Sequence, residues 1–475
     1  MSVVYIEHCF ESDTSIEYTK NEFIREVEKI SSVILTELEL EKGDIVSIFL
    51  PTSVETYMIA FAIINAGGVV NNLFQSYGDD ALLNRLAISQ PKCLITNDNH
   101  HKRVKSLWPA GQVFSSNSLI KKSSDAEVIP FSLPYDNQLM FLHFTSGTTG
   151  FPKLVPHTRK DLQGVIETNK LVFQVDDSLN YLCTADIGWV TGVYYGMFLP
   201  LLTGVKSHVV KNMDGHSLLK ALRQLKEWKI DVLYTSPTFL NMSLRYFKKH
   251  QPKLRTILSV GEKLPTALKS DYKEIGYDII DTWWQTELGC VTIASTNSSA
   301  HMGVPLPFAE LGFLQDNGDI LTACQGEDSI SGELLIRTTH PSIMEGYFNN
   351  PKANSSKFRD GFYLTGDLAR LHLSGEVEYL SRADDVLVIA GELISPDEVE
   401  SFVIDTFLEI SSSVLVKNNS GKLVLYCVGE GDEREIQNAI ADKLMSAMTP
   451  SQVIFVDNIP RTESGKIKRN LLKDA

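Results

Sequence analysis

The hydrophobic positions of the first half of the chain follow a repeating order of helix and strand. Phe23, Val27, Ile30 and Ile34 recur with the spacing of one face of an α-helix, and the compact apolar run Ile45–Leu50 has the length of a strand. The same order recurs at Ala81–Ile88 with Cys93–Thr96, and at Ser217–Trp228 with Asp231–Tyr234. Helices that alternate with short, almost continuous apolar strands are typical of parallel sheets covered on both faces. The pattern therefore predicts an α/β fold.

Near the C-terminus the pattern changes to shorter elements of mixed type. Asp384 and Asp385 precede the apolar run Val386–Ala390, which ends at Gly391. Beyond it the sequence predicts strands at Val414–Val416, Val424–Val428 and Val453–Val456, and a helix at Glu433–Ala447. A segment of this size can form its own core. We therefore expect a large N-terminal domain over residues 1–383 and a small α+β domain over residues 384–475.

Two further stretches lack this alternation. The apolar run from Tyr57 to Val70 is too short to span a bilayer, so it predicts a buried helix followed by a turn. The stretch Ser115–Asp125 reads SSNSLIKKSSD, and its polarity predicts a surface loop.

Composition and charge exclude several classes of protein. Hydrophobic residues make up 43% and charged residues 22% of the 475 residues, a balance that supports large buried cores. The formal net charge of −15 repels nucleic acid and anionic lipid, so we expect neither as a partner, and a polyanion site requires a local basic pocket. The six cysteines form no C-x-x-C pair, and the N-terminus does not read as a secretory signal. These features predict a cytoplasmic protein with reduced thiols.

The segment from Phe144 to Lys153 carries the first candidate chemistry. Small and hydroxyl-bearing residues with two glycines can fold their backbone N–H groups around an anion, and Lys153 adds a mobile positive charge. The segment is not a Walker A loop, because the G-K-[ST] sequence is missing. By themselves these residues leave open both a phosphate-binding loop and an ordinary surface loop. The loop residues are Thr145, Ser146, Gly147, Thr148, Thr149 and Gly150.

The segment T-S-G-T-T-G-F-P-K resembles the phosphate loop of the adenylate-forming superfamily, which includes acyl-CoA synthetases, peptide-synthetase adenylation domains and luciferases. Other segments resemble this family's motifs, in the family's order. They are the acyl-pocket segment Ala185–Gly192, the adenine-contacting turn Gly261–Lys263, the aromatic motif DTWWQTE at Asp281–Glu287, the ribose motif Tyr363–Asp367, the hinge Arg382–Asp384 and the catalytic-lysine loop Pro460–Lys466. The acyl-pocket and aromatic motifs are similar to those of acetyl-CoA synthetase in particular.

The resemblance implies a two-step reaction catalysed by an acid–thiol ligase. A small carboxylic acid attacks the α-phosphorus of ATP, which gives an acyl-adenylate and pyrophosphate, and a thiol then takes the acyl group. The implied cofactors are ATP and Mg²⁺, with CoA or the phosphopantetheine of a carrier protein as the thiol. The implied catalytic residues are Lys466, Lys153 and Glu287, and Thr145 and Glu287 are the implied metal ligands.

The resemblance also assigns the remaining candidate residues to subsites and to a hinge. Besides the loop and the two lysines, the implied nucleotide-binding residues are Gly261, Glu262, Lys263, Asp281, Thr282, Trp283, Gln285, Thr286, Asp367 and Arg382. The implied acyl pocket consists of Trp189, Val190, Thr191, Val260 and Trp284, the pantetheine channel passes Gly391, and Asp384 is the hinge about which the small domain rotates. Members that take longer acids carry glycine at the position of Trp284, so we expect acetate or propionate here.

Two departures from the family pattern leave alternatives open. Leu393 occupies a place where the acetyl-CoA synthetase pattern has a basic residue that reaches toward ATP, and an arginine expected near Met445 to bind the CoA nucleotide is missing. The second departure favours a carrier protein over free CoA as the thiol donor. The alternatives are an enzyme that loads a carrier protein or forms an amide, and a non-catalytic nucleotide-binding protein with a degenerate site.

Overall fold

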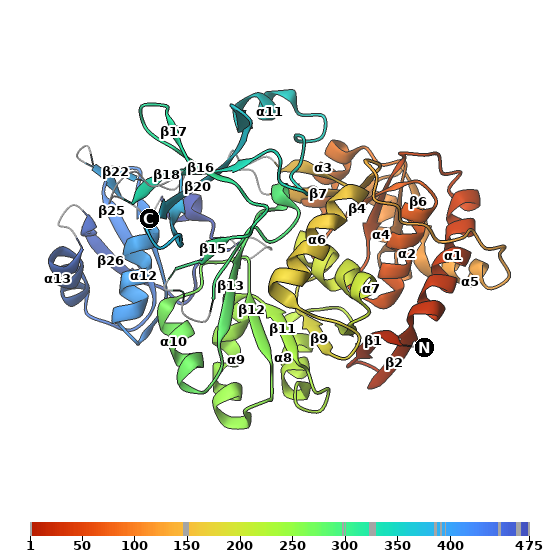
Figure 1. The fold of residues 1–475 in the computed structure, drawn as a ribbon, viewed down its shortest axis with the longest axis horizontal. Helices are drawn as coiled ribbons and strands as arrows, with labels where there is room; N and C mark the ends of the chain where they lie inside the picture. Colours follow the sequence, from red (N-terminus) through yellow and green to blue (C-terminus); the bar gives the residue numbers. More distant parts are fainter. Residues whose placement is uncertain are drawn as a thin grey trace.

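The computed structural model describes residues 2–145, 152–296, 299, 301–322, 329–383, 387–389, 392–394, 396–444, 448–461 and 467–473. Figure 1 shows how these parts are arranged. A parallel sheet from the N-terminal region lies at the right, a larger sheet lies at the lower centre, an antiparallel sheet lies above it, and the C-terminal elements lie at the left.

The N-terminal sheet has six strands in the order β6-β5-β3-β4-β7-β8. Its strands pair in parallel except for β7 and β8, which are antiparallel. The strands are β3 Ile45–Phe49, β4 Val69–Asn72, β5 Cys93–Thr96, β6 Gln112–Ser115, β7 Leu139–Thr145 and β8 Lys153–Thr158. Its helices are α2 Val54–Asn65, α3 Asp79–Ser89, α4 Asp98–Leu107 and α5 Ser116–Ser123. The alternation predicted from the hydrophobic pattern is confirmed in this sheet.

The larger sheet has nine strands in the order β15-β14-β13-β12-β11-β9-β10-β1-β2. Its central strands are parallel, and antiparallel strands lie at both edges. The strands are β1 Val3–Cys9, β2 Thr14–Thr19, β9 Asn180–Cys183, β10 Lys206–Val210, β11 Val232–Thr235, β12 Thr256–Ser259, β13 Ile279–Trp283, β14 Ile293–Ala294 and β15 Val304–Pro305. Its helices are α6 Leu162–Thr168, the π-helices η2 Asn169–Phe173 and η3 Gly192–Phe198, α7 Leu199–Thr203, α8 Gly215–Gln224, α9 Pro237–His250 and α10 Thr266–Glu274.

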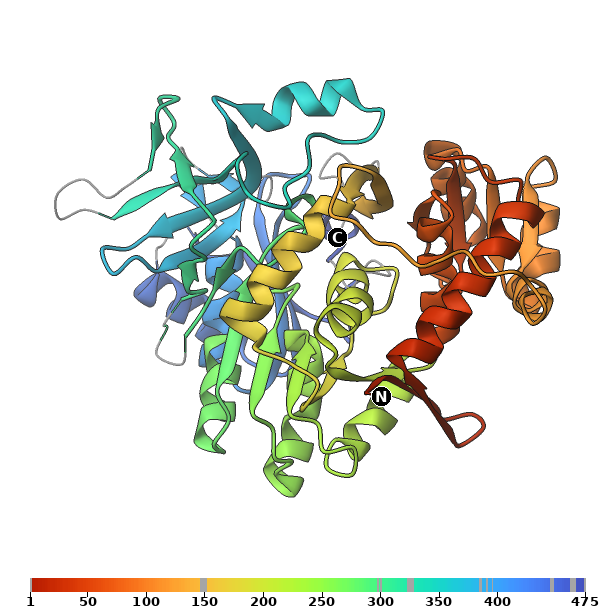
Figure 2. The ribbon, with the colours of Figure 1, turned by 45° about the vertical axis from the view of Figure 1, so that its right-hand side comes forward.

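The main hydrophobic core joins these two sheets. Helix α1, Lys20–Glu37, begins with a capping box in which Thr19 accepts from the backbone of Glu22 while the Glu22 carboxylate accepts from that of Thr19. The apolar positions that predicted this helix are all buried in the same cluster as residues of α2 and η3. Figure 2 shows α1, in red, running from the β1–β2 hairpin alongside the N-terminal sheet. Burial of this continuous apolar surface fixes the relative position of the two sheets.

A third sheet is antiparallel and was not predicted from the sequence. Five of its strands follow the order β17-β16-β18-β20-β19, and β21 pairs with β20. The strands are β16 Leu311–Leu314, β17 Ile320–Leu321, β18 Ile330–Arg337, β19 Phe358–Arg359, β20 Phe362–Leu371 and β21 Val377–Arg382, with the helix α11 Pro351–Lys357 beside them. Several of these strands are very short, and β20 contains a glycine, so their hydrophobic pattern gives little signal.

The C-terminal region has a separate small core. Strands β24 Ile410–Lys417, β25 Leu423–Gly429 and β26 Gln452–Phe455 form one sheet, which packs with helices α12 Pro396–Thr406 and α13 Glu433–Lys443, and the strands β22 Leu387–Ile389 and β23 Glu392–Ile394 form a hairpin. The strands and the helix predicted beyond Gly391 are therefore present. The division between residues 383 and 384 stays a prediction. The predicted hinge Asp384 lies outside the described residues, as do Gly391 and Met445.

The structure corrects one local prediction. The stretch expected to be a surface loop forms α5, because Ser115 caps its first turn and Leu119 is buried against the core that contains α1. The apolar run that begins at Tyr57 forms the buried helix α2 followed by a turn at Ala66–Gly68, as predicted, and its last two residues begin strand β4. Among the described helices, none combines the length and the hydrophobicity that crossing a bilayer requires.

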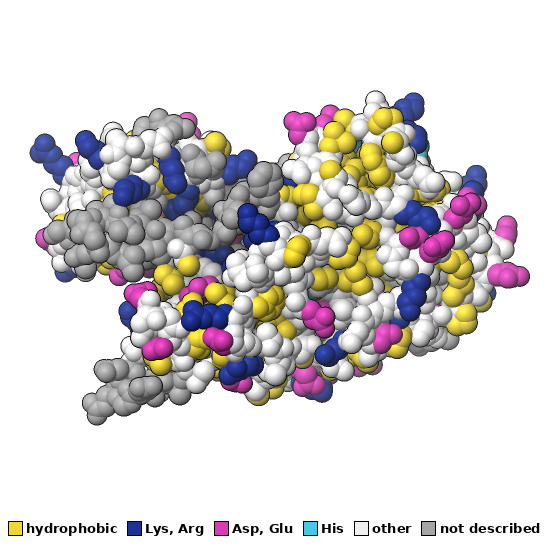
Figure 3. Space-filling model, turned by 90° about the horizontal axis from the view of Figure 1, so that it is seen from above, with side chains coloured by type: hydrophobic (Ala, Val, Ile, Leu, Met, Phe, Trp, Pro, Cys, Tyr) yellow, Lys and Arg dark blue, Asp and Glu magenta, His cyan; other side chains and the backbone are white. Residues whose placement is uncertain are grey.

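The charged side chains are distributed unevenly over the surface. Seen from above, Lys and Arg side chains gather in the left-hand part of the view, whereas larger hydrophobic areas lie toward the right (Figure 3). The net charge of −15 is therefore compatible with locally positive surface.

Two histidines form a buried neutral pair in the nine-stranded sheet. His8 Nε2 lies 2.9 Å from His208 Nδ1, His8 Nδ1 lies 2.8 Å from Ser15 Oγ, and the Trp228 ring stacks on His8 with centroids 3.8 Å apart. Burial lowers the pKa of His8 to about 4 and the pKa of His208 to about 3. Both rings are therefore neutral in the folded protein at neutral pH.

We expect this pair to make folding stability depend on pH. The unfolded chain protonates these rings near their ordinary pKa of 6.5, so the stability is full above that pH and falls as the pH drops toward about 4. The free energy of unfolding should fall by roughly 1–3 kcal/mol between about pH 7 and pH 5. Urea denaturation across this range measures it. The double variant His8→Gln/His208→Gln should lose stability at neutral pH but show a shallower pH slope, and an unchanged slope would contradict the prediction.

Candidate active site

Every candidate site residue that belongs to the described part of the chain lines one cleft, which has a volume of about 1500 Å³. It lies at the carboxyl ends of the parallel strands, where α/β sheets usually bind ligands. The candidates that line it are Thr145, Lys153, Trp189, Val190, Thr191, Val260, Gly261, Glu262, Lys263, Asp281, Thr282, Trp283, Trp284, Gln285, Thr286, Glu287, Asp367 and Arg382. The other candidates lie outside the described residues: Ser146, Gly147, Thr148, Thr149, Gly150, Asp384, Gly391 and Lys466.

At one end of the cleft, a lysine and a glutamate are linked through a tyrosine. Thr145 and Lys153 are cross-strand partners in the β7–β8 hairpin, which brings together the two ends of the predicted phosphate loop. Lys153 Nζ lies 4.9 Å from the ring centroid of Tyr347, and the Tyr347 hydroxyl donates to Glu287 Oε1 over 2.8 Å. Glu287 is only 7% exposed. This end of the cleft therefore combines a cation with a fixed carboxylate.

The centre of the site is the buried carboxylate of Asp367. Its Oδ2 accepts hydrogen bonds from Gln285 Nε2 at 2.8 Å and from Trp283 Nε1 at 3.1 Å, and its Oδ1 accepts from Arg382 Nη1 at 2.6 Å. Asp367 and Arg382 are cross-strand partners on β20 and β21, whereas Trp283 is the last residue of β13 and Gln285 follows it. The carboxylate therefore joins the antiparallel sheet to the nine-stranded sheet.

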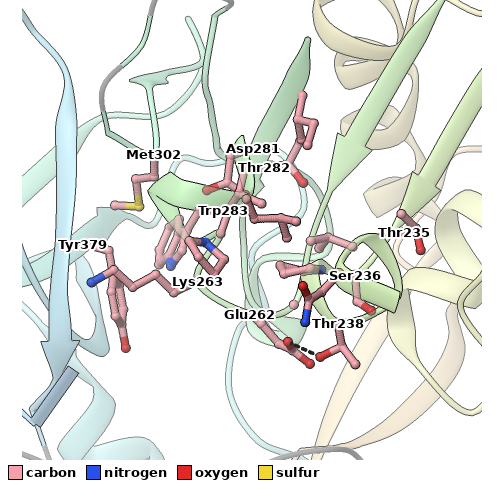
Figure 4. Close-up of a pocket in the computed structure, with 18 of the residues that line it drawn as sticks. Thr235, Ser236, Thr238, Glu262, Lys263, Asp281, Thr282, Trp283, Met302 and Tyr379 are labelled. Carbon is pink, nitrogen blue, oxygen red and sulfur yellow. Dashed lines mark hydrogen bonds between the residues drawn. The ribbon is translucent and has the colours of Figure 1, made fainter. Parts of the chain in front are cut away.

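The turn after β12 forms another wall of the cleft. Gly261 has a φ of +93°, a conformation that side chains other than glycine rarely adopt. Glu262 accepts a hydrogen bond of 2.6 Å from the Thr238 hydroxyl, which is the dashed line in Figure 4. Nearby, burial raises the pKa of Asp281 to about 7. In the same view Met302 and Tyr379 lie on the opposite side of the cavity from Thr235, Ser236 and Thr238.

The same turn contacts the C-terminal region directly. Lys263 Nζ donates to Ser401 Oγ on α12 over 3.0 Å. Burial raises the pKa of Asp405, also on α12, and the nearby backbone of Ala267 in the first turn of α10 lowers it in part. A carboxylate at a helix N-terminus is favourable because the helix dipole is positive there. Residues of both regions therefore line one continuous cleft.

One wall of the candidate acyl pocket is an indole that is held in place. Trp284 Nε1 donates to the Tyr234 hydroxyl over 3.1 Å, and the Trp284 ring meets Tyr195 edge-on with centroids 5.4 Å apart. Val190 and Val260 lie on the wall of the same cleft. Because both tyrosines are fully buried, the indole has little freedom to move aside.

Sequence reasoning missed three residues that shape the site: Tyr234, Tyr347 and Lys357. Tyr234 positions Trp284, Tyr347 connects Lys153 to Glu287, and Lys357 lines the cleft from the end of α11. Tyr347 and Lys357 stand outside the motifs that we compared, and Tyr234 lies in an ordinary buried strand. Only the fold brings them to the cleft, so no signal in the sequence could have identified them.

Glu287 suits a magnesium ligand, since Mg²⁺ prefers hard oxygen donors and is usually held by one or two carboxylates together with substrate phosphates. The carboxylate is buried and fixed by Tyr347, and the Thr145 side chain lines the same cleft. A second cluster, His301, His372 and Glu378, has its potential ligand atoms within 4.8 Å of one another. The two imidazole rings are stacked in parallel, with 1° between their planes, so their lone pairs do not converge on one ion as they stand.

Comparison with known proteins places the chain in a family. The family model described as AMP-binding enzyme matches residues 3–348. This chain belongs to the AMP-binding enzyme family. It is 30% identical to the acetyl-coenzyme A synthetase of Bacillus subtilis, over 96% of this chain and 84% of that protein. It is 29% identical to the acetyl-coenzyme A synthetase of Pyrobaculum arsenaticum, over 96% of this chain and 76% of that protein.

Solved structures share the fold of this AMP-binding enzyme. The AMP complex of O-succinylbenzoate coenzyme A synthetase from Bacillus subtilis superposes with a TM-score of 0.87 at 22% identity, over 100% of this chain and 96% of that chain. ATP-bound MatB from Rhodopseudomonas palustris superposes with a TM-score of 0.86 at 21% identity, over 99% of this chain and 95% of that chain. The resemblance to adenylate-forming enzymes and the predicted α/β fold are confirmed.

We expect the Asp367–Arg382 pair to hold the site of this AMP-binding enzyme together. Asp367→Asn keeps the side-chain shape but leaves the largely buried Arg382 guanidinium without its counter-charge, so the free energy of unfolding should fall by about 2–4 kcal/mol. Urea denaturation measures the change. Asp360→Asn is the matched control, because the Asp360 side chain is 72% exposed, and it should change stability by at most about 0.5 kcal/mol. Equal losses of unfolding free energy in the two variants would show that the buried pair contributes no more to stability than an exposed aspartate does.

Proposed function

We propose that this enzyme is an AMP-forming acid–thiol ligase that activates a small carboxylic acid with ATP and transfers the acyl group to CoA. The observation that carries the proposal is the content of one cleft. It combines the Lys153–Tyr347–Glu287 group, the Asp367 carboxylate and the apolar side chains of Val190, Val260 and Trp284. The acetyl-coenzyme A synthetases to which the chain is similar support this reaction.

In the first half-reaction, an oxygen of the acid forms a bond to the α-phosphorus of ATP, and the bond from that phosphorus to the pyrophosphate oxygen breaks. Such a step requires positioning and positive charge around the phosphates more than covalent chemistry. We assign Lys153 to the polyphosphate and Asp367 to the ribose hydroxyls. Lys466, from the C-terminal loop, is assigned to the incoming carboxylate and the α-phosphate. Glu287 and Thr145 would hold Mg²⁺, which neutralises phosphate charge when bound.

The remaining candidates complete the nucleotide site in this proposal. The turn at Gly261–Lys263 and the strand end at Asp281–Trp283 would contact the base, and Gln285 and Arg382 would hold Asp367 in place. Thr286 and residues 146–150 would surround the phosphates. The alternative of a degenerate binding protein rests on Leu393 alone, whereas the connection of Lys153 to Glu287 through Tyr347 supports the catalytic proposal.

In the second half-reaction, the sulfur of the thiol attacks the acyl carbon and AMP leaves. We assign the acceptor to CoA, with the pantetheine arm passing Gly391 and the small domain turning about Asp384 between the two steps. A carrier-protein thiol is the competing acceptor that the missing basic residue near Met445 favours. We further propose a cytoplasmic location, in keeping with the scattered cysteines, and no nucleic-acid or membrane partner.

Exchange of labelled pyrophosphate into ATP, measured with a panel of C2 to C8 acids, tests the proposal. We expect exchange that depends on acetate or propionate, and a loss of about 100-fold or more in Lys466→Ala, because charge stabilisation at the α-phosphate is lost. That variant should still form the thioester from supplied acetyl-adenylate and CoA. The absence of exchange with every acid would favour the binding-only alternative. Thioester formation with a carrier protein but not with CoA would overturn the assignment of the acceptor.

We expect Trp284 to limit the length of the acid. Each buried methylene contributes about 0.8 kcal/mol, and a pocket filled by an indole denies that gain to longer chains. Trp284→Gly should shift the preference from C2 and C3 acids toward C6 and C8, while acetate loses contacts and leaves a cavity. The measurement is kcat/KM for each acid. If the unmodified enzyme already prefers hexanoate or octanoate, or if the variant's profile does not move, Trp284 does not set the chain length.

A further inference from the structure

Lys357 is a lysine inside the cleft that no motif of the sequence identified. It is the last residue of α11, and its Nζ donates to the backbone carbonyl of Leu364 over 3.2 Å. It lines the same cleft as Lys153 and Glu287. Burial lowers the pKa of its ammonium group, as expected for a cation withdrawn from water. Keeping a lysine half-buried in this way costs free energy, so its position requires an explanation beyond surface solubility.

The neighbours of Lys357 are the groups that surround the phosphates in the proposed reaction. The charged groups that interact electrostatically with Lys357 are Glu333, Arg382, Glu287 and Lys153. A Cβ atom added at Gly366 would lie 3.1 Å from Arg382 Nη2 and 3.4 Å from Lys357 Nζ, so these two cationic groups flank the ribose motif at that glycine. The carboxylates of Asp367 and Glu333 lie beside these cations, since Asp367 accepts from Arg382 and Glu333 accepts from the backbone N–H of Gly366. They offset part of the repulsion between the two like charges, and a bound phosphate would offset more of it.

The helix that carries Lys357 is fastened to the same end of the cleft. The Asn354 side chain on α11 accepts from the backbone N–H of Tyr347 over 2.7 Å and donates to the carbonyl of Tyr347 over 3.2 Å. Tyr347 is the residue that contacts both Lys153 and Glu287. Helix α11 therefore fixes the position of Lys357 relative to Lys153 and Glu287, which face the phosphates in the proposed reaction.

We propose that Lys357 is a further phosphate-binding residue of the adenylation half-reaction and supplies the positive charge that Leu393 cannot. This inference rests on the proposed function. An ammonium group carries three N–H donors, and the bond to Leu364 uses one of them. As the carboxylate oxygen bonds to the α-phosphorus and the pyrophosphate oxygen leaves, negative charge builds up on the phosphate oxygens. The ammonium group of Lys357 stabilises that charge.

The test compares Lys357→Met with Lys352→Met, a matched substitution at an exposed lysine in the first turn of the same helix. In acetate-dependent pyrophosphate–ATP exchange, we expect Lys357→Met to lower kcat/KM for ATP by about 10- to 100-fold, the usual value of a charge-assisted hydrogen bond. Lys352→Met should stay within about twofold of the unmodified enzyme, and Lys357→Arg, which keeps the charge, should recover most of the loss.

Two readouts separate phosphate binding from a structural role. Calorimetric titration should show weaker binding of ATP to Lys357→Met but unchanged binding of adenosine, which has no phosphate. Thioester formation from supplied acetyl-adenylate and CoA should stay within about threefold of the unmodified enzyme.

The inference is overturned if Lys357→Met behaves like Lys352→Met in the exchange assay. It is also overturned if Lys357→Met weakens the binding of adenosine by the same factor as the binding of ATP, or if Lys357→Arg does not recover the lost activity. Either result shows a structural role for the lysine. Absence of exchange in the unmodified enzyme instead overturns the proposed function itself, so the two failures are distinguishable.

Discussion

The geometry of the cleft depends on one buried carboxylate. Asp367 is 3% exposed and accepts hydrogen bonds from Arg382 on the antiparallel sheet, from Trp283 on the nine-stranded sheet and from Gln285 just after it. A charge in such a place is tolerated only when its partners are fixed, and those partners are in turn fixed by it. The relative position of the ribose motif on β20 and the aromatic motif after β13 therefore follows from this single group.

The sequence predicted most of the fold's parallel part because its strands are compact apolar runs that alternate with amphipathic helices. The face defined by Phe23 and Val27 and the strand at Cys93–Thr96 were found from that pattern alone. The antiparallel sheet was not predicted, since β17 and β19 are only two residues long and the longer strands β18 and β20 contain glycine and polar residues that interrupt the apolar pattern. Helix α5 was not predicted because most of its residues are polar. The burial of its Leu119 depends on the rest of the core and cannot be read from the local sequence.

For the site, motif resemblance identified residues that lie close together in the sequence, and the fold brought those motifs to one cleft. It could not identify Tyr347 or Lys357, whose importance comes from what they contact rather than from the residues beside them in the chain. It also could not show that Tyr234 holds the indole of Trp284. Tertiary contacts of this kind leave no local trace, because the residue type by itself does not show which distant groups its side chain contacts.

The hydrogen bond between Lys263 and Ser401 has a consequence for how ligand occupancy and domain position influence each other. Lys263 stands beside Glu262 in the turn that lines the cleft, and Ser401 lies on α12 of the C-terminal region. A ligand that competes for Lys263 weakens this contact, and by thermodynamic reciprocity the contact weakens the binding of that ligand by the same free energy. The turn and the C-terminal region are thereby coupled through this ammonium group. When a ligand engages Lys263, filling the cleft and holding α12 against the turn become opposing events.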